Sequence, residues 1–118
     1  MSPTRHHLSI ERQSITHHFT IDELDGYFTV GLFDDGRPGE LFVRISKEGS
    51  TLSGAMDSFA VAVSLLLQYG VPLEKLVEKF THVHFEPAGM TRNKEIPTAK
   101  SVVDYIFRWM ERRFLLDK

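Results

Sequence analysis

The chain has 118 residues, of which 42% are apolar and 25% are charged, so it is long enough for one soluble globular domain and too short for two. A formal net charge of -2 argues against a protein that mainly coats nucleic acid, and the absence of cysteine excludes disulfides, thiolate metal sites and cysteine-radical chemistry. The longest apolar run, 59–67, is too short to cross a bilayer and no hydrophobic signal region is present, so we expect a cytoplasmic protein.

The first part of the chain predicts a flexible arm and then a sheet. Residues 1–11 are polar and rich in histidine and arginine, which is typical of a flexible amino-terminal arm, and residues 12–118 are expected to form a single domain. Turn-forming residues at 22–26 and 34–39 separate segments in which apolar and polar side chains alternate, the pattern of a half-buried strand. We expect the three strands of an antiparallel meander at Ser14–Ile21, Tyr27–Phe33 and Glu40–Ser46.

The segment from Ser50 to Tyr69 predicts one long helix whose two ends are both marked. Ser50 or Thr51 can cap its start with a hydroxyl, and Gly70 suits the left-handed residue that closes a helix. Its apolar residues do not keep to one stripe. We therefore expect a buried central helix with other elements packed on more than one side of it.

Two shorter helices are expected after the long one. Pro72 precedes apolar residues at helical spacing that end near Thr81, and Pro97 opens a last helix with one apolar and one charged face. Residues 83–93 contain proline and glycine and predict an ordered loop. Three strands followed by three helices predict an α+β fold, with the helices on one face of the sheet and the other face open to solvent or to a partner.

The turn at the start of the long helix is a candidate site for an anion or a nucleotide phosphate, because it combines free backbone N–H groups, hydroxyls and the positive end of a helix dipole. It lacks the spacing of a nucleotide-binding P-loop, and helix capping with close packing of small residues explains the same sequence without a ligand. The candidate residues are Lys47, Gly49, Ser50, Thr51, Ser53 and Gly54.

A candidate metal site is formed by His82, His84 and Glu86, which an extended chain would place on one face. Such a site would also need a ligand from another element, for which His17 or His18 is available. The alternative is that these are surface or hydrogen-bonding histidines.

Basic residues gather late in the chain around Tyr105 and Trp109. Such a surface can follow a phosphate backbone, although the interleaved acidic residues also fit the solvated face of a helix. The basic residues are Arg92, Lys94, Lys100, Arg108, Arg112 and Arg113. No nucleophile turn or catalytic set is recognisable, so we expect no reaction by the chain itself.

Several segments in register resemble one known family, over about residues 12–109. They are RQSITH at 12–17, DGRPGELF at 35–42, KEGST at 47–51, LQYGVPL at 67–73, HFEPAG at 84–89, and AKS followed by DYIFRW at 99–109. In this order they resemble the carboxy-terminal TSCPD domain of adenosylcobalamin-dependent (class II) ribonucleotide reductases.

The resemblance implies kinship with enzymes that reduce ribonucleotides by means of a cobalamin-generated thiyl radical and a cysteine pair on a large catalytic barrel. This chain has no cysteine, not even in the motif for which the domain is named, and it is too short for that barrel. No catalytic or cobalamin-binding residue of the family can therefore be placed on it. We expect an accessory, non-catalytic domain of deoxyribonucleotide synthesis that itself binds no adenosylcobalamin.

Two functions remain open from the sequence. In the first, the chain is an interaction module that docks on a ribonucleotide reductase subunit, or on itself as a homodimer, through the open sheet face or the small residues of the long helix. In the second, it is a small nucleotide- or single-strand-binding module, with a phosphate at the turn 49–54 and basic residues of the last helix as a clamp.

Overall fold

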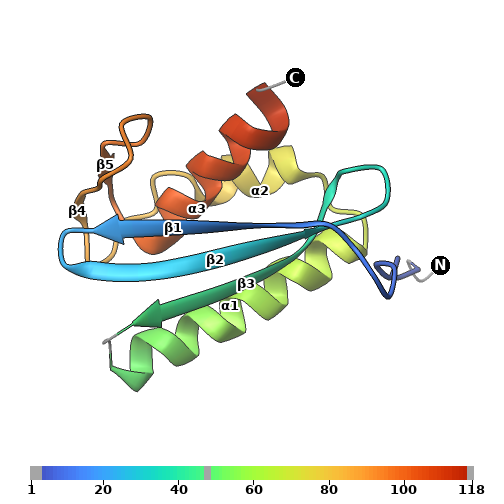
Figure 1. Cartoon of the computed structure of the whole chain (residues 1–118), viewed down its shortest axis with the longest axis horizontal. Coiled ribbons are helices and arrows are strands. Elements are labelled where there is room, and N and C mark those ends of the chain that lie inside the picture. The colour runs from blue at the N-terminus through green and yellow to red at the C-terminus, as the bar shows by residue number, and fades with distance from the viewer. Residues whose placement is uncertain (1–3, 47–48, 117–118) are drawn as a thin grey trace.

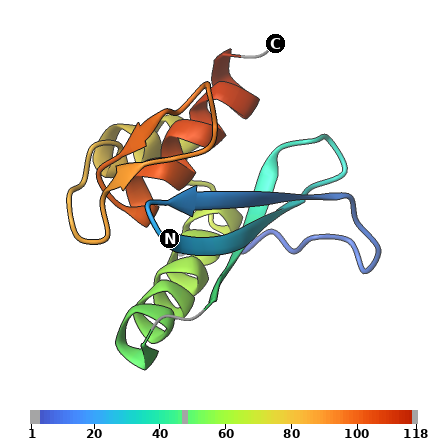
Figure 2. The same ribbon diagram turned by 60° about the vertical axis from the view of Figure 1, so that its left-hand side comes forward.

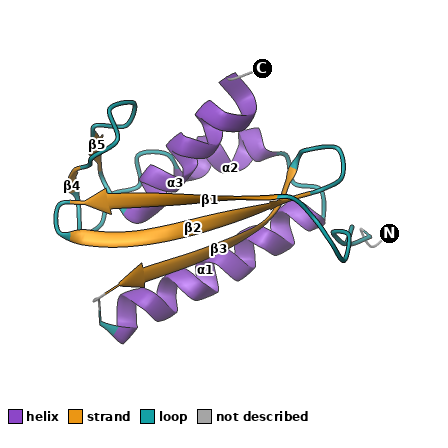
Figure 3. Ribbon diagram, viewed as in Figure 1, coloured by secondary structure: helices purple, strands orange, loops and turns teal. Residues whose placement is uncertain are grey.

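The computed structural model describes residues 4–46 and 49–116, drawn in Figure 1. Three long strands come first and three helices follow, with a small hairpin between the second and third helices (Figure 3). The predicted α+β order is confirmed. The elements are β1 (Ser14–Ile21), β2 (Leu24–Leu32), β3 (Pro38–Ser46), α1 (Ser50–Gln68), α2 (Leu73–Phe80), β4 (Gly89–Met90), β5 (Thr98–Ala99), α3 (Val102–Met110) and the π-helical turn η1 (Glu111–Leu116).

β1, β2 and β3 form one antiparallel sheet in that order, as predicted. β1 has the predicted bounds, but β2 begins at Leu24 rather than at Tyr27, because the turn between the two strands uses only Asp22 and Glu23. Asp22 takes a positive φ of 51°, the left-handed backbone that a two-residue hairpin turn needs and that aspartate tolerates.

The inner face of the sheet carries the core and is covered by α3. Phe28 of β2 contacts Tyr105 and Trp109 of α3, with ring centroids 6.3 and 5.0 Å apart. Phe19 of β1 lies 5.3 Å from Tyr105. The neighbouring strand residues point to the opposite face and are mostly exposed there, so the predicted alternation is confirmed.

α1 runs along the outer edge of β3 (Figure 1). Leu41 N–H donates a hydrogen bond to Ser64 Oγ at 2.8 Å, and Gln68 Nε2 donates to Gly39 O at 2.9 Å. These helix side chains occupy backbone groups that an edge strand otherwise leaves unpaired. The sheet therefore has one edge closed by a helix and one edge, along β1, that is not closed in this way.

The expectation that α1 is a buried central helix is corrected by its exposed side. Other elements do pack on two of its sides: β3 lies along one, and on another Phe59 contacts Phe80 of α2 and Phe107 of α3 at centroid distances of 5.1 and 6.1 Å. Val61 and Leu65, however, remain 61% and 39% exposed. The helix lies at the margin of the sheet, where no other described element covers the side that carries these two residues.

By length and composition alone, α1 is one helix that could cross a membrane. This corrects the expectation that no segment is long enough, which considered only the apolar run 59–67. The core helix of a soluble protein satisfies the same criterion. In this fold the helix is bonded through Ser64 and Gln68 to the backbone of β3.

The two ends of α1 differ from one another in how well the sequence predicted them. Gly49 caps the start with no side-chain hydrogen bond, so the predicted hydroxyl cap by Ser50 or Thr51 is wrong. Both residues already have helical backbone, whereas a capping residue must lie just outside the helix. At the other end Gly70 has a φ of 91° and Val71 N–H donates back into the last turn, so the predicted left-handed ending is confirmed.

α3 begins at Val102 and not at the predicted Pro97, because residues 98–99 form β5 and pair with β4. Ser101 caps α3, with its hydroxyl oxygen accepting from Asp104 N–H at 2.9 Å. The start of this helix is therefore set by its cap.

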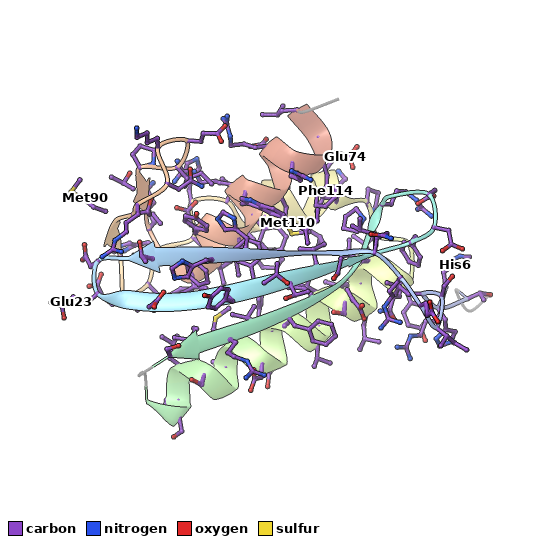
Figure 4. The ribbon with its side chains drawn as sticks, viewed as in Figure 1. His6, Glu23, Glu74, Met90, Met110 and Phe114 are labelled. Carbon is purple, nitrogen blue, oxygen red and sulfur yellow. The ribbon has the colours of Figure 1, made fainter. Side chains whose placement is uncertain are left out.

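The β4–β5 hairpin, whose first strand was predicted as part of a loop and whose second strand was predicted as the start of a helix, extends one end of the sheet. Asp22 N–H donates to Met90 O at 2.7 Å, and Figure 4 shows Glu23 and Met90 at the same end of the molecule. The hairpin thereby places residues 91–97, which connect β4 to β5, beside β1.

The predicted flexible arm contacts the body of the domain over its described residues, 4–11. Arg5 Nε donates to Gln68 Oε1 at 2.7 Å, and His6 N–H donates to Gln68 O at 2.8 Å. The arm therefore adds to the closed edge of the sheet at the end of α1.

Candidate functional site

A cleft of about 440 Å³ lies beside the free edge of β1. One wall is β1 at residues 17–20, the opposite wall is the β4–β5 connection at residues 92–96, and α3 with η1 closes the third side. Figure 2 shows the connection and α3 on the same side of β1. We call this cavity the β1 cleft.

A hydrogen-bonded chain of three side chains lies at the inner wall of the β1 cleft. The hydroxyl of the buried Tyr105 lies 2.8 Å from His17 Nε2, and Asn93 Nδ2 donates to the same oxygen at 3.0 Å. Burial lowers the pKa of His17, with a smaller contribution from His18, so a neutral imidazole is favoured at pH 7. Because Asn93 already donates to the Tyr105 oxygen, the His17 tautomer that accepts at Nε2 is the one that gives the Tyr105 proton an acceptor, and burial raises the pKa of Tyr105.

Positive charge gathers at the mouth of the β1 cleft. Its lining includes Arg92, Arg112 and Arg113, against one carboxylate, Glu95, which pairs with Arg112. Within the described ranges 4–46 and 49–116, the side chains of Arg92 and Arg113 have no carboxylate within salt-bridge distance. The cleft is thus a local basic site on a chain whose formal net charge is -2.

The predicted basic and aromatic cluster is therefore divided by the fold. Arg108 is held elsewhere, by Asp104 and by Thr98 O, and does not line the β1 cleft. Lys94 and Lys100 are exposed outside it. The three arginines named above lie in the cleft together with both predicted aromatic residues.

A second surface lies on the other side of the sheet. Four large apolar side chains are exposed there, and we call the surface they form the outer apolar face: Tyr27 (46%), Phe42 (56%), Val61 (61%) and Leu65 (39%). The strands and α1 enclose a shallow groove of about 760 Å³ between them. This is the open sheet face that the sequence predicted, widened by the exposed side of α1.

The small residues of α1 also lie on its exposed side. Gly54, Ser58 and Ala62 recur at every fourth position and are all exposed. A side chain added at Gly54 would meet no atom within 4 Å, so close packing within this chain does not explain the glycine. The stripe is continuous with the outer apolar face on the helix surface.

The candidate anion turn lies at the free end of α1. Gly49 caps the helix, Ser50 and Thr51 are exposed, and Lys47 lies outside the described residues. A shallow cavity beside Leu52 is lined by carboxylates rather than by basic groups. These carboxylates belong to Asp22, Glu23 and Glu86. A phosphate site formed by this turn, including Ser53 and Gly54, stays a prediction.

Of the three predicted metal ligands, His84 and Glu86 face each other, whereas His82 is turned toward a carboxylate outside the set. His82 Nδ1 faces Asp104 at 3.9 Å, and His84 Nε2 faces Glu86 at 3.7 Å. No group of three or more histidine or acidic side chains able to hold a metal occurs in the part of the chain that the structure describes. His17 and His18, which would have had to join them, are bonded to Tyr105 and Asp25.

Asp104 is a residue whose importance the sequence analysis missed. Its fully buried carboxylate accepts from His82 N–H at 2.7 Å and from Lys100 N–H at 2.8 Å, and Arg108 lies 3.3 Å away. It thereby ties both ends of the segment 82–100 to α3. The available signal was the Ser101 to Asp104 spacing, which is typical of a capped helix start.

Comparison with known proteins gives the family. The family model described as "TSCPD domain" matches residues 4–114. The chain is 57% identical over 113 residues to a vitamin B12-dependent ribonucleotide reductase of Rhodopirellula baltica, covering 96% of this chain and 11% of the relative. Identity to the enzymes of the same name from Streptomyces avermitilis and Agrobacterium fabrum is 50% and 45%, over 96% and 98% of this chain and 12% and 9% of theirs.

The chain thus spans about a tenth of the length of these relatives. No solved structure matches it significantly.

Proposed function

The chain belongs to the TSCPD domain family, and on that premise we propose that it is an accessory, non-catalytic module of vitamin B12-dependent ribonucleotide reduction. It docks on the body of a reductase through the outer apolar face and serves deoxyribonucleotide synthesis without a reaction of its own. We propose a cytoplasmic location for this work. The resemblance drawn from the sequence motifs is confirmed by the family match.

The observation that carries this proposal is an exposed apolar surface on a chain that spans only about a tenth of the length of its relatives. Monomeric proteins seldom leave several large apolar side chains together in water, and such surfaces usually mark contacts. In the relatives the matched region is one part of a much longer chain. The remainder of that longer chain is the surface that we expect to cover the face.

One feature supports a role without catalysis. The chain has no cysteine, so it cannot supply a thiyl radical or a reducing thiol pair. That the chain itself binds no adenosylcobalamin stays a prediction from the sequence.

The test is binding of the purified chain to a vitamin B12-dependent reductase from which the matching region has been deleted. Isothermal calorimetry should show one complex, and Val61→Asp should weaken it about thirtyfold, or about 2 kcal/mol, because a charge would be buried in an apolar contact. Unchanged affinity of the variant would overturn the assignment of this surface.

Leu116→Asp is the matched control, because Leu116 is 66% exposed on η1 and lies outside the outer apolar face. It should leave the affinity unchanged. Light scattering of the chain alone identifies the other occupant: a dimer that Val61→Asp dissociates would mean that a second copy, and not the reductase, covers the face.

A further inference from the structure

The β1 cleft has a charge pattern that the docking function does not use. Arg92 and Arg113 come from different segments of the chain, and neither side chain is neutralised by a carboxylate among the described residues. Arg112 shares Glu95 and adds a third guanidinium to the same lining. Guanidinium groups left unpaired around one cavity favour an anion with several oxygens, such as a phosphate.

Aromatic rings stand next to this charge. Trp109 and His17 lie with ring centroids 5.3 Å apart, and Tyr105 lies 5.7 Å from His17, all three lining the cleft. Trp109 is only partly buried, so a planar group can reach it. A ligand that combines a phosphate with a flat ring matches both parts of the lining.

One directional donor is left over for such a ring. In the His17 tautomer that accepts at Nε2 from Tyr105, the ring proton is on Nδ1. Among the described residues, no hydrogen bond involves His17 Nδ1. A carbonyl oxygen or a ring nitrogen of the ligand is a suitable acceptor for that proton.

The wall that carries Arg92 is held in place before any ligand arrives. Arg92 N–H donates to Thr20 Oγ1 of β1 at 3.2 Å, and Asn93 Nδ2 donates to Tyr105 of α3 at 3.0 Å. Asn93 Oδ1 in turn accepts from Glu95 N–H at 2.9 Å. A cleft whose walls are already joined loses less conformational freedom on binding than a mobile loop would.

We propose that the β1 cleft binds a phosphorylated nucleoside, with the phosphates at the three arginines and the base against Trp109 and His17. A volume of about 440 Å³ suits one nucleotide, either free or as one unit of a single strand. The site lies apart from the outer apolar face and from the turn 49–54. It does not depend on docking to a reductase.

The experiment measures the melting temperature and the calorimetric affinity of the full chain with adenosine, AMP, ATP, inorganic tripolyphosphate and an eight-residue oligothymidylate. At about a hundredfold excess over the dissociation constant, a bound nucleotide should raise the melting temperature by about 10 °C. ATP should bind about tenfold more tightly than tripolyphosphate, because only ATP has a base to stack.

The double variant Arg92→Gln, Arg113→Gln should lower the affinity for ATP by about a hundredfold, since two charge-assisted contacts are lost. Both side chains are exposed and without carboxylate partners in the described ranges, so the variant should fold normally. Arg44→Gln is the matched control, because Arg44 is an exposed arginine that lines the groove on the opposite face. Its affinity for ATP should equal that of the unchanged chain.

Three results would overturn the proposal: no thermal shift with any nucleotide, equal affinities for ATP and tripolyphosphate, or no effect of the double variant. Tighter binding of the oligothymidylate than of ATP would identify a single strand as the ligand, and the reverse order would identify a free nucleotide. Val61→Asp should leave nucleotide binding unchanged, so failure of this site is distinguishable from failure of the docking surface.

Discussion

The two edges of the sheet are finished by different means, and each leaves a different surface beside it. The edge of β3 is closed by a helix whose Ser64 and Gln68 bond to the strand backbone, and the surface next to it is apolar. The edge of β1 is lined by a polar loop and by the end of α3, and the surface next to it is a basic cleft. A three-stranded sheet thereby offers one surface suited to a protein and one suited to a small anion.

The comparison shows that, in this fold, the residues that close or hold an edge of the sheet are different from the residues that form the surface beside it. On the β3 side, Ser64 and Gln68 satisfy backbone groups of the strand, and Leu65 and Leu66 between them are apolar and exposed. On the β1 side, the loop is tied down by Asp104 and Asn93, and its arginine is left for a ligand. Substitutions of the residues that make these hydrogen bonds should therefore affect one edge without the other.

The largest expected effect comes from Asp104→Ala. The substitution removes a fully buried carboxylate and leaves the backbone N–H groups of His82 and Lys100 without their acceptor, so it should lower the free energy of unfolding by about 3 kcal/mol. Urea denaturation measures this loss. Nucleotide binding should weaken as well, because the segment 82–100 carries one wall of the β1 cleft.

Asp57→Ala controls for the loss of a carboxylate. Asp57 is exposed on α1 and makes no hydrogen bond to another described side chain, so its removal should change the free energy of unfolding by less than about 0.5 kcal/mol. Equal losses in the two variants would show that Asp104 does not tie the segment 82–100 to the core.

Gln68→Ala is the corresponding change at the β3 edge, with a smaller expected effect. It removes the donor to Gly39 O and the acceptor of Arg5 Nε, and it should cost about 1.5 kcal/mol. Limited proteolysis should also cut the arm at residues 4–11 faster, because Arg5 loses its side-chain partner. Gln13→Ala, at an exposed glutamine directly before β1, should change neither result.

Nucleotide binding by Gln68→Ala sharpens the contrast between the edges. The β1 cleft contains neither Gln68 nor its partners, so the affinity for ATP should stay within about twofold of the unchanged chain. A large loss of nucleotide affinity would mean that the two edges are coupled through the sheet.

The three strands and the end of α1 could be predicted because their signals are local. Alternation within β1 fixes which residues face inward, and Gly70 allows the left-handed turn that ends the helix. β4 and β5 have two residues each and carry no periodicity, so only their pairing defines them. Pro97 is as compatible with a loop before a strand as with a first helical turn. The start of α3 is set instead by the capping residue Ser101.

Only part of the candidate site could be predicted from the sequence, because some of its residues are brought together by the fold alone. The arginines and aromatic residues of the β1 cleft stand close together late in the chain. His17 is separated from Tyr105 by 88 positions, and only the packing of α3 on β1 brings them together. Arg108 has the same composition signal as Arg112, but the buried Asp104 diverts it from the cleft.

The smallest expected effect is a pH dependence that belongs to the β1 edge. Burial lowers the pKa of His17 below 6.5, so at intermediate pH the folded chain binds fewer protons than the unfolded chain does. The contribution of the neutral imidazole to stability is therefore fully present above about pH 6.5 and is lost as the pH falls through the lowered pKa.

His17→Gln should remove this dependence, since glutamine can still accept from Tyr105 but does not titrate. His18→Gln should retain it, because His18 is exposed on the opposite face of β1 and contributes only the smaller part of the shift. Thermal unfolding between about pH 7.5 and 5.5 compares the three chains. Parallel losses of stability in the unchanged chain and in His17→Gln would mean that the titrating group lies elsewhere. The described bonds that close the β3 edge come from Ser64 and Gln68, which do not titrate, so a dependence abolished at His17 assigns the acid sensitivity to the edge that holds the cleft.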